Sequence, residues 1–167
     1  IGTLEFNIIS VADTLEAIKV VNPKIKFYQA SSSEMFGKVK KENLPVKEDF
    51  MFYPVSPYGI SKAAAHWLVV NNREGYRLFA VCGILFNHES VLRGSSFVTK
   101  KIVNTAVKIK MGLLNKLELG NLKIYRDWGY TPKYVEAMWL MLQQELPKDY
   151  IICSGEAHSL EEFVTMT

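Results

Sequence analysis

The sequence predicts an α/β fold with a mainly parallel sheet and helices on its faces. Short apolar runs of strand length alternate with helical segments along the chain, and this order is typical of βαβ units. The run 78–85 contains no charged residue, as expected of a strand that is buried on both faces. With 167 residues, the chain is long enough to form one domain with its own core.

The first half of the chain has clear boundaries between its expected elements. Apolar residues at helical spacing end before Pro23, which cannot continue a helix. Ser56 and Pro57 suit the N-cap and the first position of a second helix. In order, the sequence predicts a helix over 4–21, a strand over 26–30, a loop over 37–53, a helix over 58–74 and a strand over 77–85.

The second half continues the alternation with shorter elements. Gly112 and Gly155 mark turns, and Ser159 with Glu162 matches the capping box that opens a helix. In order, the sequence predicts a loop over 87–94, a helix over 97–111, a strand over 116–119, a helix over 132–144, a strand over 150–153 and a last helix from about 160.

Composition excludes several classes of protein. Hydrophobic residues make up 49% and charged residues 22%, which is globular rather than disordered. The net charge of +3 is spread along the chain, so we expect no nucleic-acid partner. No apolar run approaches the roughly 20 residues of a membrane span, and no signal peptide is visible. We therefore expect a cytoplasmic protein without a membrane partner, with Cys82 and Cys153 as buried thiols.

Tyr58 and Lys62 form the most informative pair in the chain. Residues four apart share one face of a helix, so the phenol and the ammonium lie together. A phenol has an ordinary pKa of about 10, and a nearby ammonium favours its ionised form. A tyrosine in such a position can accept a proton near neutral pH, which indicates general base catalysis.

Polar side chains follow the strands on either side of this helix. Ser32 and Glu34 come directly after the first predicted strand, and Asn87 and His88 follow the next one. Ligands of parallel α/β sheets bind outside the carboxyl ends of the strands. We therefore expect these side chains to meet the tyrosine and the lysine at one edge of the sheet.

Each of these residues also has an ordinary structural interpretation. A tyrosine and a lysine at helical spacing are usually a solvated pair, and serines at a strand end commonly bond to local backbone. Glu34 also suits an exposed helix start, His88 an ordinary loop position, and Arg126 an ion pair with Asp127. No cluster of His, Cys and Asp has the spacing of metal ligands, so we expect no metal site.

Several further stretches narrow the interpretation. They are 27–34, 83–90, 97–99, 119–122, 126–129 and 134–144, and the strings at 87–90 and 126–129 are the most specific. Together with the Tyr-x-x-x-Lys spacing, they resemble the GDP-mannose 4,6-dehydratases, a family among the extended short-chain dehydrogenase/reductases that act on nucleotide sugars. The resemblance runs from about Lys26 to Gly155.

The resemblance implies a Rossmann-type fold and the conversion of GDP-mannose to GDP-4-keto-6-deoxymannose, with the hydride of an NADP cofactor recycled within one turnover. Tyr58 matches the residue that takes a proton from the sugar 4-hydroxyl, and Lys62 the lysine that holds the cofactor ribose. Both therefore belong to the cofactor site. Glu34 matches the base that removes the C5 proton. Ser32 stands where the family usually has threonine, and its hydroxyl can still donate a hydrogen bond to the 4-oxygen.

The resemblance also implies contacts from the later loops. His88 and Arg93 match residues that contact the cofactor. Asn87 matches a substrate contact near the pyrophosphate, and Arg126 an arginine whose guanidinium can fork onto phosphate oxygens. Members of the family commonly form dimers or tetramers, so we expect a homo-oligomer.

The chain departs from the family pattern at three places. Val91 and Leu92 remove one cation from a loop that commonly holds two arginines, and Lys133 replaces an acidic residue at a helix start. No Gly-x-Gly-x-x-Gly stretch is present to hold a cofactor pyrophosphate. We therefore expect 1–167 to be a partial NAD(P)-binding Rossmann-like domain, a central fragment that includes the start of the substrate-binding region at about 95–150.

Two other functions stay open. A related nucleotide-sugar epimerase or reductase shares the tyrosine and the lysine but does not need Glu34. A truncated remnant without catalysis would keep the active-site residues but lack the cofactor cradle, and we expect the fragment alone to have little or no turnover.

Overall fold

The computed structural model describes residues 1–167 and divides them into two compact units. Unit 1 comprises Ile1–Phe86 and Tyr134–Ile152, and unit 2 comprises Asn87–Lys133 and Cys153–Thr167. The chain therefore leaves unit 1 after the second strand of its sheet and returns to it within a helix.

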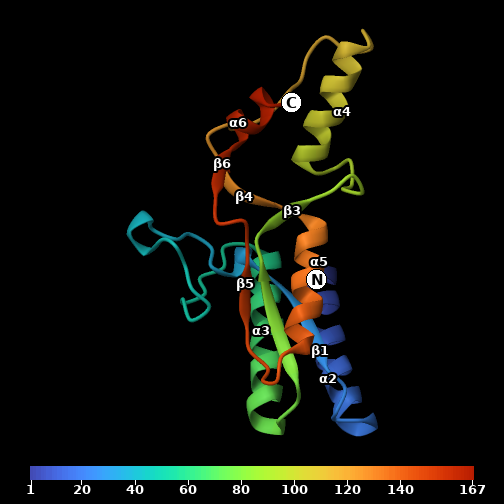
Figure 1. Ribbon diagram of the computed structural model, residues 1–167, viewed down its shortest axis with the longest axis vertical. Helices are drawn as coiled ribbons and strands as arrows, with labels where there is room; N and C mark the ends of the chain where they lie inside the picture. Colours follow the sequence, from blue (N-terminus) through green and yellow to red (C-terminus); the bar gives the residue numbers. More distant parts are fainter. The chain divides into compact units, whose positions relative to one another are not determined.

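The sheet of unit 1 is entirely parallel, as the sequence predicts. It contains β1 (Phe27–Ser32), β2 (Ala80–Leu85) and β5 (Tyr150–Ile152) in the order β1-β2-β5 (Figure 1). Central β2 is buried along almost its whole length, which explains its uncharged sequence. The carboxyl ends of β1 and β2 are in register, with Ser32 opposite Leu85.

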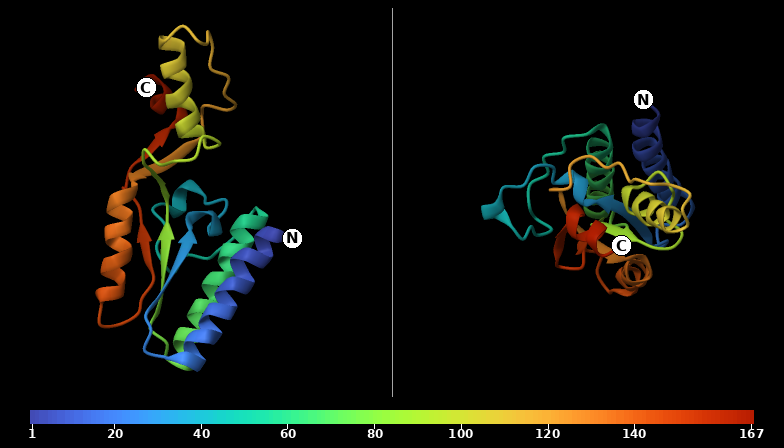
Figure 2. Two further views of the ribbon diagram at one scale, coloured as in Figure 1. Left: turned by 90° about the vertical axis from the view of Figure 1, so that its right-hand side faces the viewer. Right: turned by 90° about the horizontal axis from the view of Figure 1, so that it is seen from above.

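Helices cover both faces of this sheet. Figure 2 shows α2 (Ser10–Val21) and α3 (Pro57–Tyr76) side by side on one face, with α5 (Thr131–Gln143) on the other. The helices α2 and α3 share a buried apolar cluster with the sheet, and this cluster fixes the face that each helix presents. Its fully or nearly buried members are Val11, Leu15, Ile18, Ala65, Val69, Leu78, Ala80 and Cys82.

The N-terminal helical segment is interrupted by a wider turn. The predicted helix over 4–21 is present as α1 (Gly2–Leu4), a π-helical turn η1 (Glu5–Ile9) and α2. Turns of this kind change the direction of side chains within a helix and are common beside functional sites. Nothing in the hydrophobic periodicity predicts this turn.

The start of α3 agrees with the sequence in detail. Ser56 is the N-cap, and its hydroxyl oxygen accepts a hydrogen bond from the backbone N–H of Gly59 at 3.0 Å, while Pro57 takes the first helical position. The helix ends where Arg77 adopts a left-handed conformation with φ 57°. Two short 3₁₀ helices, η2 (Ser33–Met35) and η3 (Lys41–Asn43), lie between β1 and α3.

Unit 2 has a small mixed sheet of its own. It contains β3 (Asn87–Glu89), β4 (Tyr125–Tyr130) and β6 (Ala157–Ser159), with β3–β4 parallel and β4–β6 antiparallel. The helices of this unit are α4 (Val98–Lys110) and α6 (Leu160–Thr165). The capping box predicted at Ser159 and Glu162 is present in full.

Several sequence predictions are wrong in this part of the chain. Residues 116–119 form no strand, whereas 87–89, 125–130 and 157–159 are strands that the sequence analysis did not predict. Strands this short are decided by their pairing partners rather than by their own composition, so local pattern is a poor guide. Cys153 is exposed rather than buried, whereas Cys82 is buried as expected.

The helices of the structure include none whose length and apolarity would let it span a bilayer.

Candidate active site

The end of β1 holds two of the predicted catalytic residues. Ser32 closes the strand and caps η2, with its hydroxyl oxygen accepting a hydrogen bond from the backbone N–H of Glu34 at 3.2 Å. The Ser32 side chain is largely buried, while Glu34 is exposed. Because the Glu34 amide occupies an acceptor position of the hydroxyl, the O–H of Ser32 remains able to donate to another group.

Tyr58 lies in the first turn of α3, directly against this strand end. Its neighbour Gly59 is buried, and a β-carbon at Gly59 would lie 2.7 Å from the backbone carbonyl oxygen of Glu34 and 3.1 Å from Cβ of Pro54. The absent side chain at Gly59 therefore lets α3 begin in contact with η2. Tyr58 itself is 43% exposed, so its phenol is accessible to a ligand.

Lys62 connects α3 with β1. Its Nζ donates a hydrogen bond to the carbonyl oxygen of Ala30 at 3.0 Å and lies 5.7 Å from the centre of the Tyr58 ring. Burial lowers the pKa of Lys62 below its ordinary value. The predicted sharing of one helix face by Tyr58 and Lys62 is therefore present, and the lysine is held in place by the strand.

An open cleft adjoins Lys62. Its volume is about 310 Å³, and it lies between the first helical segment and β1. Its lining includes Lys62, Ala30 and Gln29 and, from the other side, Asn7 and Ser10. This cleft brings polar groups of the π-helical turn to the side chain of Lys62.

Asn7 was missed by the sequence analysis. It lies in the π-helical turn, and its side-chain amide donates to the hydroxyl of Ser61 at 3.0 Å, while that hydroxyl donates to the carbonyl oxygen of Tyr58 at 2.7 Å. A side-chain amide within the apolar run 6–9 is the only sequence signal for this contact. The two hydrogen bonds tie the first helical segment to the turn of α3 that carries Tyr58.

The remaining predicted residues belong to unit 2, so the predicted set divides evenly between the units. Asn87 and His88 lie on β3, where Asn87 pairs with Trp128 and His88 with Gly129 of β4. The strings 87–90 and 126–129 are the most specific stretches of the sequence, and residues 87–88 of the first pair with residues 128–129 of the second. Their pairing gives a structural reason for their joint occurrence.

Arg93 and Arg126 differ in how firmly they are held. Nε of Arg93 forms an ion pair with Glu89 at 3.1 Å, and its guanidinium carbon lies 3.6 Å from the centre of the Phe97 ring. Arg126 is exposed, and its Nη1 donates to the carbonyl oxygen of its neighbour Tyr125. The carboxylate of Asp127 instead accepts hydrogen bonds from backbone N–H groups after β5, so it does not serve as the partner of Arg126.

A second polar cluster in unit 1 lies further along α3. The two carboxylate oxygens of Asp149 accept hydrogen bonds from Arg73 at 2.6 and 2.8 Å, and Oδ1 also accepts the backbone N–H of Cys82 at 2.9 Å. Burial alone would raise the pKa of Asp149, but the hydrogen bond and charge of Arg73 outweigh it and hold the pKa below its ordinary value. Burial raises the pKa of the Cys82 thiol and lowers the pKa of His66.

Comparison with known proteins gives a consistent assignment. The family model described as GDP-mannose 4,6 dehydratase matches residues 1–167, the whole of the chain. The chain belongs to the GDP-mannose 4,6-dehydratase family. The resemblance inferred from the sequence over about Lys26 to Gly155 is therefore confirmed, and the family match extends beyond it to residues 1–167.

Relatives within the dehydratase family are similar along most of the chain. The GDP-mannose 4,6 dehydratase of Cricetulus griseus is 52% identical over 164 residues, which are 98% of this chain and 42% of the relative. The GDP-mannose 4,6 dehydratase 2 of Arabidopsis thaliana is 56% identical over 143 residues, which are 86% of this chain and 38% of the relative. The chain thus spans about two fifths of the length of these dehydratases.

Solved structures agree with the dehydratase assignment at the level of fold. RMD from Pseudomonas aeruginosa, complexed with NADPH, has a TM-score of 0.92 and 26% identity, and the match covers 98% of this chain and 56% of that one. The dTDP-glucose 4,6-dehydratase of Bacillus anthracis, in complex with NAD, has a TM-score of 0.86 and 24% identity, with coverages of 98% and 52%. The predicted Rossmann-type α/β fold is confirmed.

Proposed function

We propose that this chain carries the catalytic groups of a GDP-mannose 4,6-dehydratase, which converts GDP-mannose to GDP-4-keto-6-deoxymannose with NADP as its cofactor. One observation carries the proposal. The contact between η2 and the first turn of α3 brings Ser32, Glu34, Tyr58 and Lys62 to the carboxyl end of β1. Membership of the family supports the choice of reaction.

Tyr58 is the proton acceptor in this proposal. It takes the proton of the sugar 4-hydroxyl as that carbon is oxidised to a ketone. The ammonium of Lys62 lies 5.7 Å from the centre of the Tyr58 ring, so the two groups can face the same substrate. The hydrogen bond from Lys62 to Ala30 fixes the ammonium in this position, which reduces the reorganisation needed during the reaction.

Ser32 and Glu34 act on the sugar itself. The O–H of Ser32 donates to the 4-oxygen, since the acceptor side of the hydroxyl is already used by the amide of Glu34. The new 4-ketone acidifies the neighbouring C5 proton, and the exposed carboxylate of Glu34 removes it. Water then leaves from C6, and C5 is reprotonated after hydride is added at C6.

The residues present fit one end of a nicotinamide dinucleotide. The cleft of about 310 Å³ beside Lys62 lies at the small end of the usual range for ligand sites, about 300–1,000 Å³. The ammonium of Lys62 can donate to ribose hydroxyls there. A bound nicotinamide would supply the hydride acceptor for C4 and the hydride donor for C6. Of the two solved structures described above, the one with the higher TM-score and identity is complexed with NADPH and the other with NAD, and the first is the basis for proposing NADP.

The proposal also assigns cofactor and substrate contacts to four residues of unit 2. His88 and Arg93 contact the cofactor, Asn87 contacts the substrate near its pyrophosphate, and Arg126 binds phosphate or nucleotide oxygens. The exposed guanidinium of Arg126 suits this role, because its side chain makes no ion pair with the adjacent Asp127. Residues 1–167 then form a partial NAD(P)-binding domain with the start of the substrate-binding region at about 95–150.

The proposal also covers the substrate, the oligomeric state and the location of the enzyme. GDP-mannose is the substrate, and we expect a homo-oligomer, either a dimer or a tetramer, in the cytoplasm. Size-exclusion chromatography with light scattering tests the oligomeric state, and it requires the complete open reading frame that contains these residues.

Turnover of GDP-mannose with added NADP tests the reaction. The complete open reading frame is expressed as wild type, Glu34→Gln and Tyr58→Phe, and the product is analysed by mass spectrometry and NMR. We expect a 4-keto-6-deoxy sugar from the wild type and a loss of at least about 100-fold in kcat for each variant, which is the usual contribution of a general acid or base.

An exposed residue of η3 and an exposed residue at the end of α3 provide matched controls. Glu42→Gln and Tyr76→Phe make the same chemical changes away from the strand end and should leave kcat within about twofold. A product that keeps its 6-hydroxyl, together with a harmless Glu34→Gln, would assign the chain to the epimerases or reductases instead. A folded protein without any turnover would support the interpretation of the chain as a truncated remnant without catalysis.

A further inference from the structure

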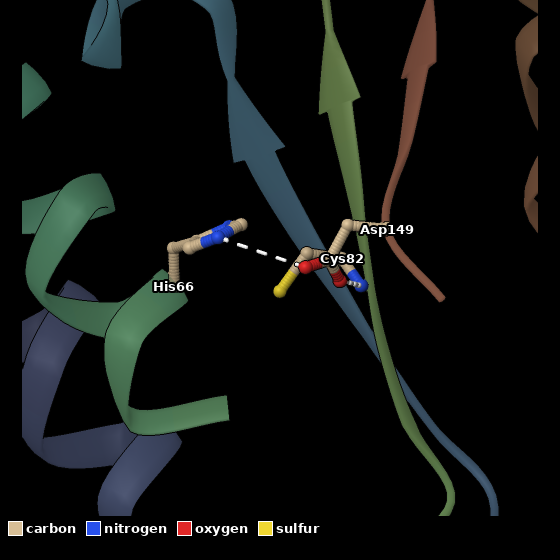
Figure 3. Close-up of side chains that lie close together, drawn as sticks. All are labelled: His66, Cys82 and Asp149. Carbon is tan, nitrogen blue, oxygen red and sulfur yellow. Dashed lines mark hydrogen bonds and ion pairs between the residues drawn. The ribbon is translucent and has the colours of Figure 1, made fainter. Parts of the chain in front are cut away.

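We propose that His66, Cys82 and Asp149 form a binding site for one divalent transition-metal cation of the zinc class. The three candidate ligand atoms, an imidazole nitrogen, a thiol sulfur and a carboxylate oxygen, all lie within 4.8 Å of one another. His66 comes from α3, Cys82 from β2 and Asp149 from the residue before β5, and Figure 3 shows the three side chains directed toward one another.

The spacing of these atoms suits a tetrahedral ion. Zinc bonds to nitrogen and oxygen are about 2.0–2.2 Å long and bonds to sulfur about 2.3 Å, so neighbouring ligand atoms lie about 3.3–3.8 Å apart. Nε2 of His66 lies 3.7 Å from Oδ2 of Asp149, which is too long for a hydrogen bond but within that range. Since the three atoms lie within 4.8 Å of one another, binding requires them to approach by at most about 1.5 Å.

The buried imidazole of His66 has one ring nitrogen, Nδ1, that lacks a partner, while its other nitrogen, Nε2, faces Asp149. The residue is only 4% exposed, and its Nδ1 is buried without a hydrogen-bond partner. Its other contacts are edge-to-face ring contacts with Phe52 and Trp67. Buried imidazoles usually use their nitrogens as donors, acceptors or metal ligands, so a buried Nδ1 without a hydrogen-bond partner is unusual.

A cleft gives a cation access to this imidazole. It has a volume of about 220 Å³, His66 is part of its lining, and Glu48 and Asp49 are among the other lining residues. Both carboxylates are exposed and raise the local concentration of cations. An access route and an oxygen, nitrogen and sulfur ligand set are two of the features required of a metal site.

Arg73 decides how tightly the site can bind. Its guanidinium holds both oxygens of Asp149, but each carboxylate oxygen has two lone pairs, so Oδ2 can accept a cation as well. Such an outer-shell donor orients a ligand carboxylate. The charge of Arg73 also repels the cation, and the Cys82 thiol must release its proton to solvent, so we expect affinity below that of structural zinc sites.

Titration with Co²⁺, a spectroscopic substitute for Zn²⁺, tests the proposal. The purified protein is first freed of metal with a chelator and then titrated under anaerobic conditions. We expect one equivalent to bind, with a thiolate-to-cobalt charge-transfer band, and Zn²⁺ to displace it. Cys82→Ser should abolish the band. His66→Gln should weaken cobalt binding by more than about 100-fold, which is more than the loss of a residue that only orients a ligand would cause.

Surface ligands provide the matched controls. Cys153→Ser removes the exposed cysteine and His158→Gln an exposed histidine, and both variants should retain the band. Loss of the band in these variants, or its survival in Cys82→Ser, would overturn the proposal. Zinc X-ray absorption on the wild type requires no variant to fold: one sulfur with nitrogen and oxygen neighbours is expected, and a shell without sulfur would contradict it.

Discussion

A β-carbon on Gly59 would lie 2.7 Å from the backbone carbonyl oxygen of Glu34. Real side chains essentially never approach so closely, and the atom in the way is backbone, which cannot rotate aside. The contact joins the first turn of α3, which carries Tyr58, to the turn that carries Glu34. The spacing of the two proposed catalytic residues therefore depends on the absence of a side chain between them.

Gly59→Ala is expected to destabilise the protein by about 1–3 kcal/mol, the usual cost of overpacking a close contact. A glycine within a helix is otherwise replaced by alanine with a gain of about 0.5–1 kcal/mol. Gly75→Ala, in the same helix with nothing within 4 Å of the added carbon, is the control and should show that gain. Urea unfolding measures the unfolding free energy of both variants. Equal gains in stability would show that the contact between Gly59 and Glu34 is not tight.

The stability of the protein should depend on the titration of Lys62. Burial lowers the pKa of Lys62 in the folded state below its ordinary value of 10.5. The unfolded chain therefore holds more protons between these two values, so stability rises with pH across that window. We expect the unfolding free energy of the wild type, relative to Lys62→Met, to increase as pH rises toward 10.5.

Lys24→Met provides the comparison, because Lys24 is exposed. The difference in unfolding free energy between Lys24→Met and the wild type should stay constant over the same pH range. Urea unfolding at each pH measures it. Parallel curves for Lys24→Met and Lys62→Met would mean that the folded environment of Lys62 does not disfavour its charge.

Asp149→Asn should destabilise the protein by about 3 kcal/mol in the presence of a chelator, because it leaves the charge of Arg73 without a partner. The ion pair is largely buried, with side-chain exposures of 15% for Arg73 and 14% for Asp149. The double variant Arg73→Met/Asp149→Leu removes both charges and should recover much of the loss. Thermal and urea unfolding compare them, and a double variant no more stable than Asp149→Asn would argue against an uncompensated charge.

Asp127→Ala should loosen the turn after β5 in unit 2. The carboxylate of Asp127 accepts the backbone N–H groups of Ser154, at 2.8 and 3.1 Å, and of Gly155, at 2.8 Å. Losing a buried acceptor of this kind costs about 1–3 kcal/mol. Amide hydrogen exchange followed by NMR should show faster exchange at Ser154 and Gly155, with a smaller change for Asp127→Asn, which keeps one oxygen. Unchanged exchange in Asp127→Ala would contradict this role.

Local sequence signals predicted the helices well because they act over three or four residues. The N-cap at Ser56, the capping box at Ser159 and the shared helix face of Tyr58 and Lys62 are all present in the structure. Each depends on a residue and its neighbours one turn away, so the chain specifies it before any tertiary contact forms. The central strand β2 was equally clear, since burial on both faces requires an uncharged run.

The short strands of unit 2 could not be predicted in the same way. Residues 116–119 have a strand-like pattern but no partner in a sheet, whereas the polar residues 87–89 form a strand because β4 pairs with them. Pairing supplies the backbone hydrogen bonds and outweighs the weak preference of so few residues. The π-helical turn at Glu5–Ile9 is likewise absent from the periodicity of the sequence.

The sequence by itself predicted the fold class through its buried uncharged runs, and the shared helix face of Tyr58 and Lys62 through their spacing. The family and the roles of the proposed catalytic residues came instead from the resemblance of its motifs to the dehydratases. Only the tertiary structure determined which residues from distant parts of the chain lie close together. Asn7 reaches Ser61, and His66, Cys82 and Asp149 gather from one helix and two strand regions, although the sequence predicted no metal site. Residues far apart in the chain become neighbours only when the sheet and its helices pack. The spacing of residues along the sequence therefore cannot predict such contacts.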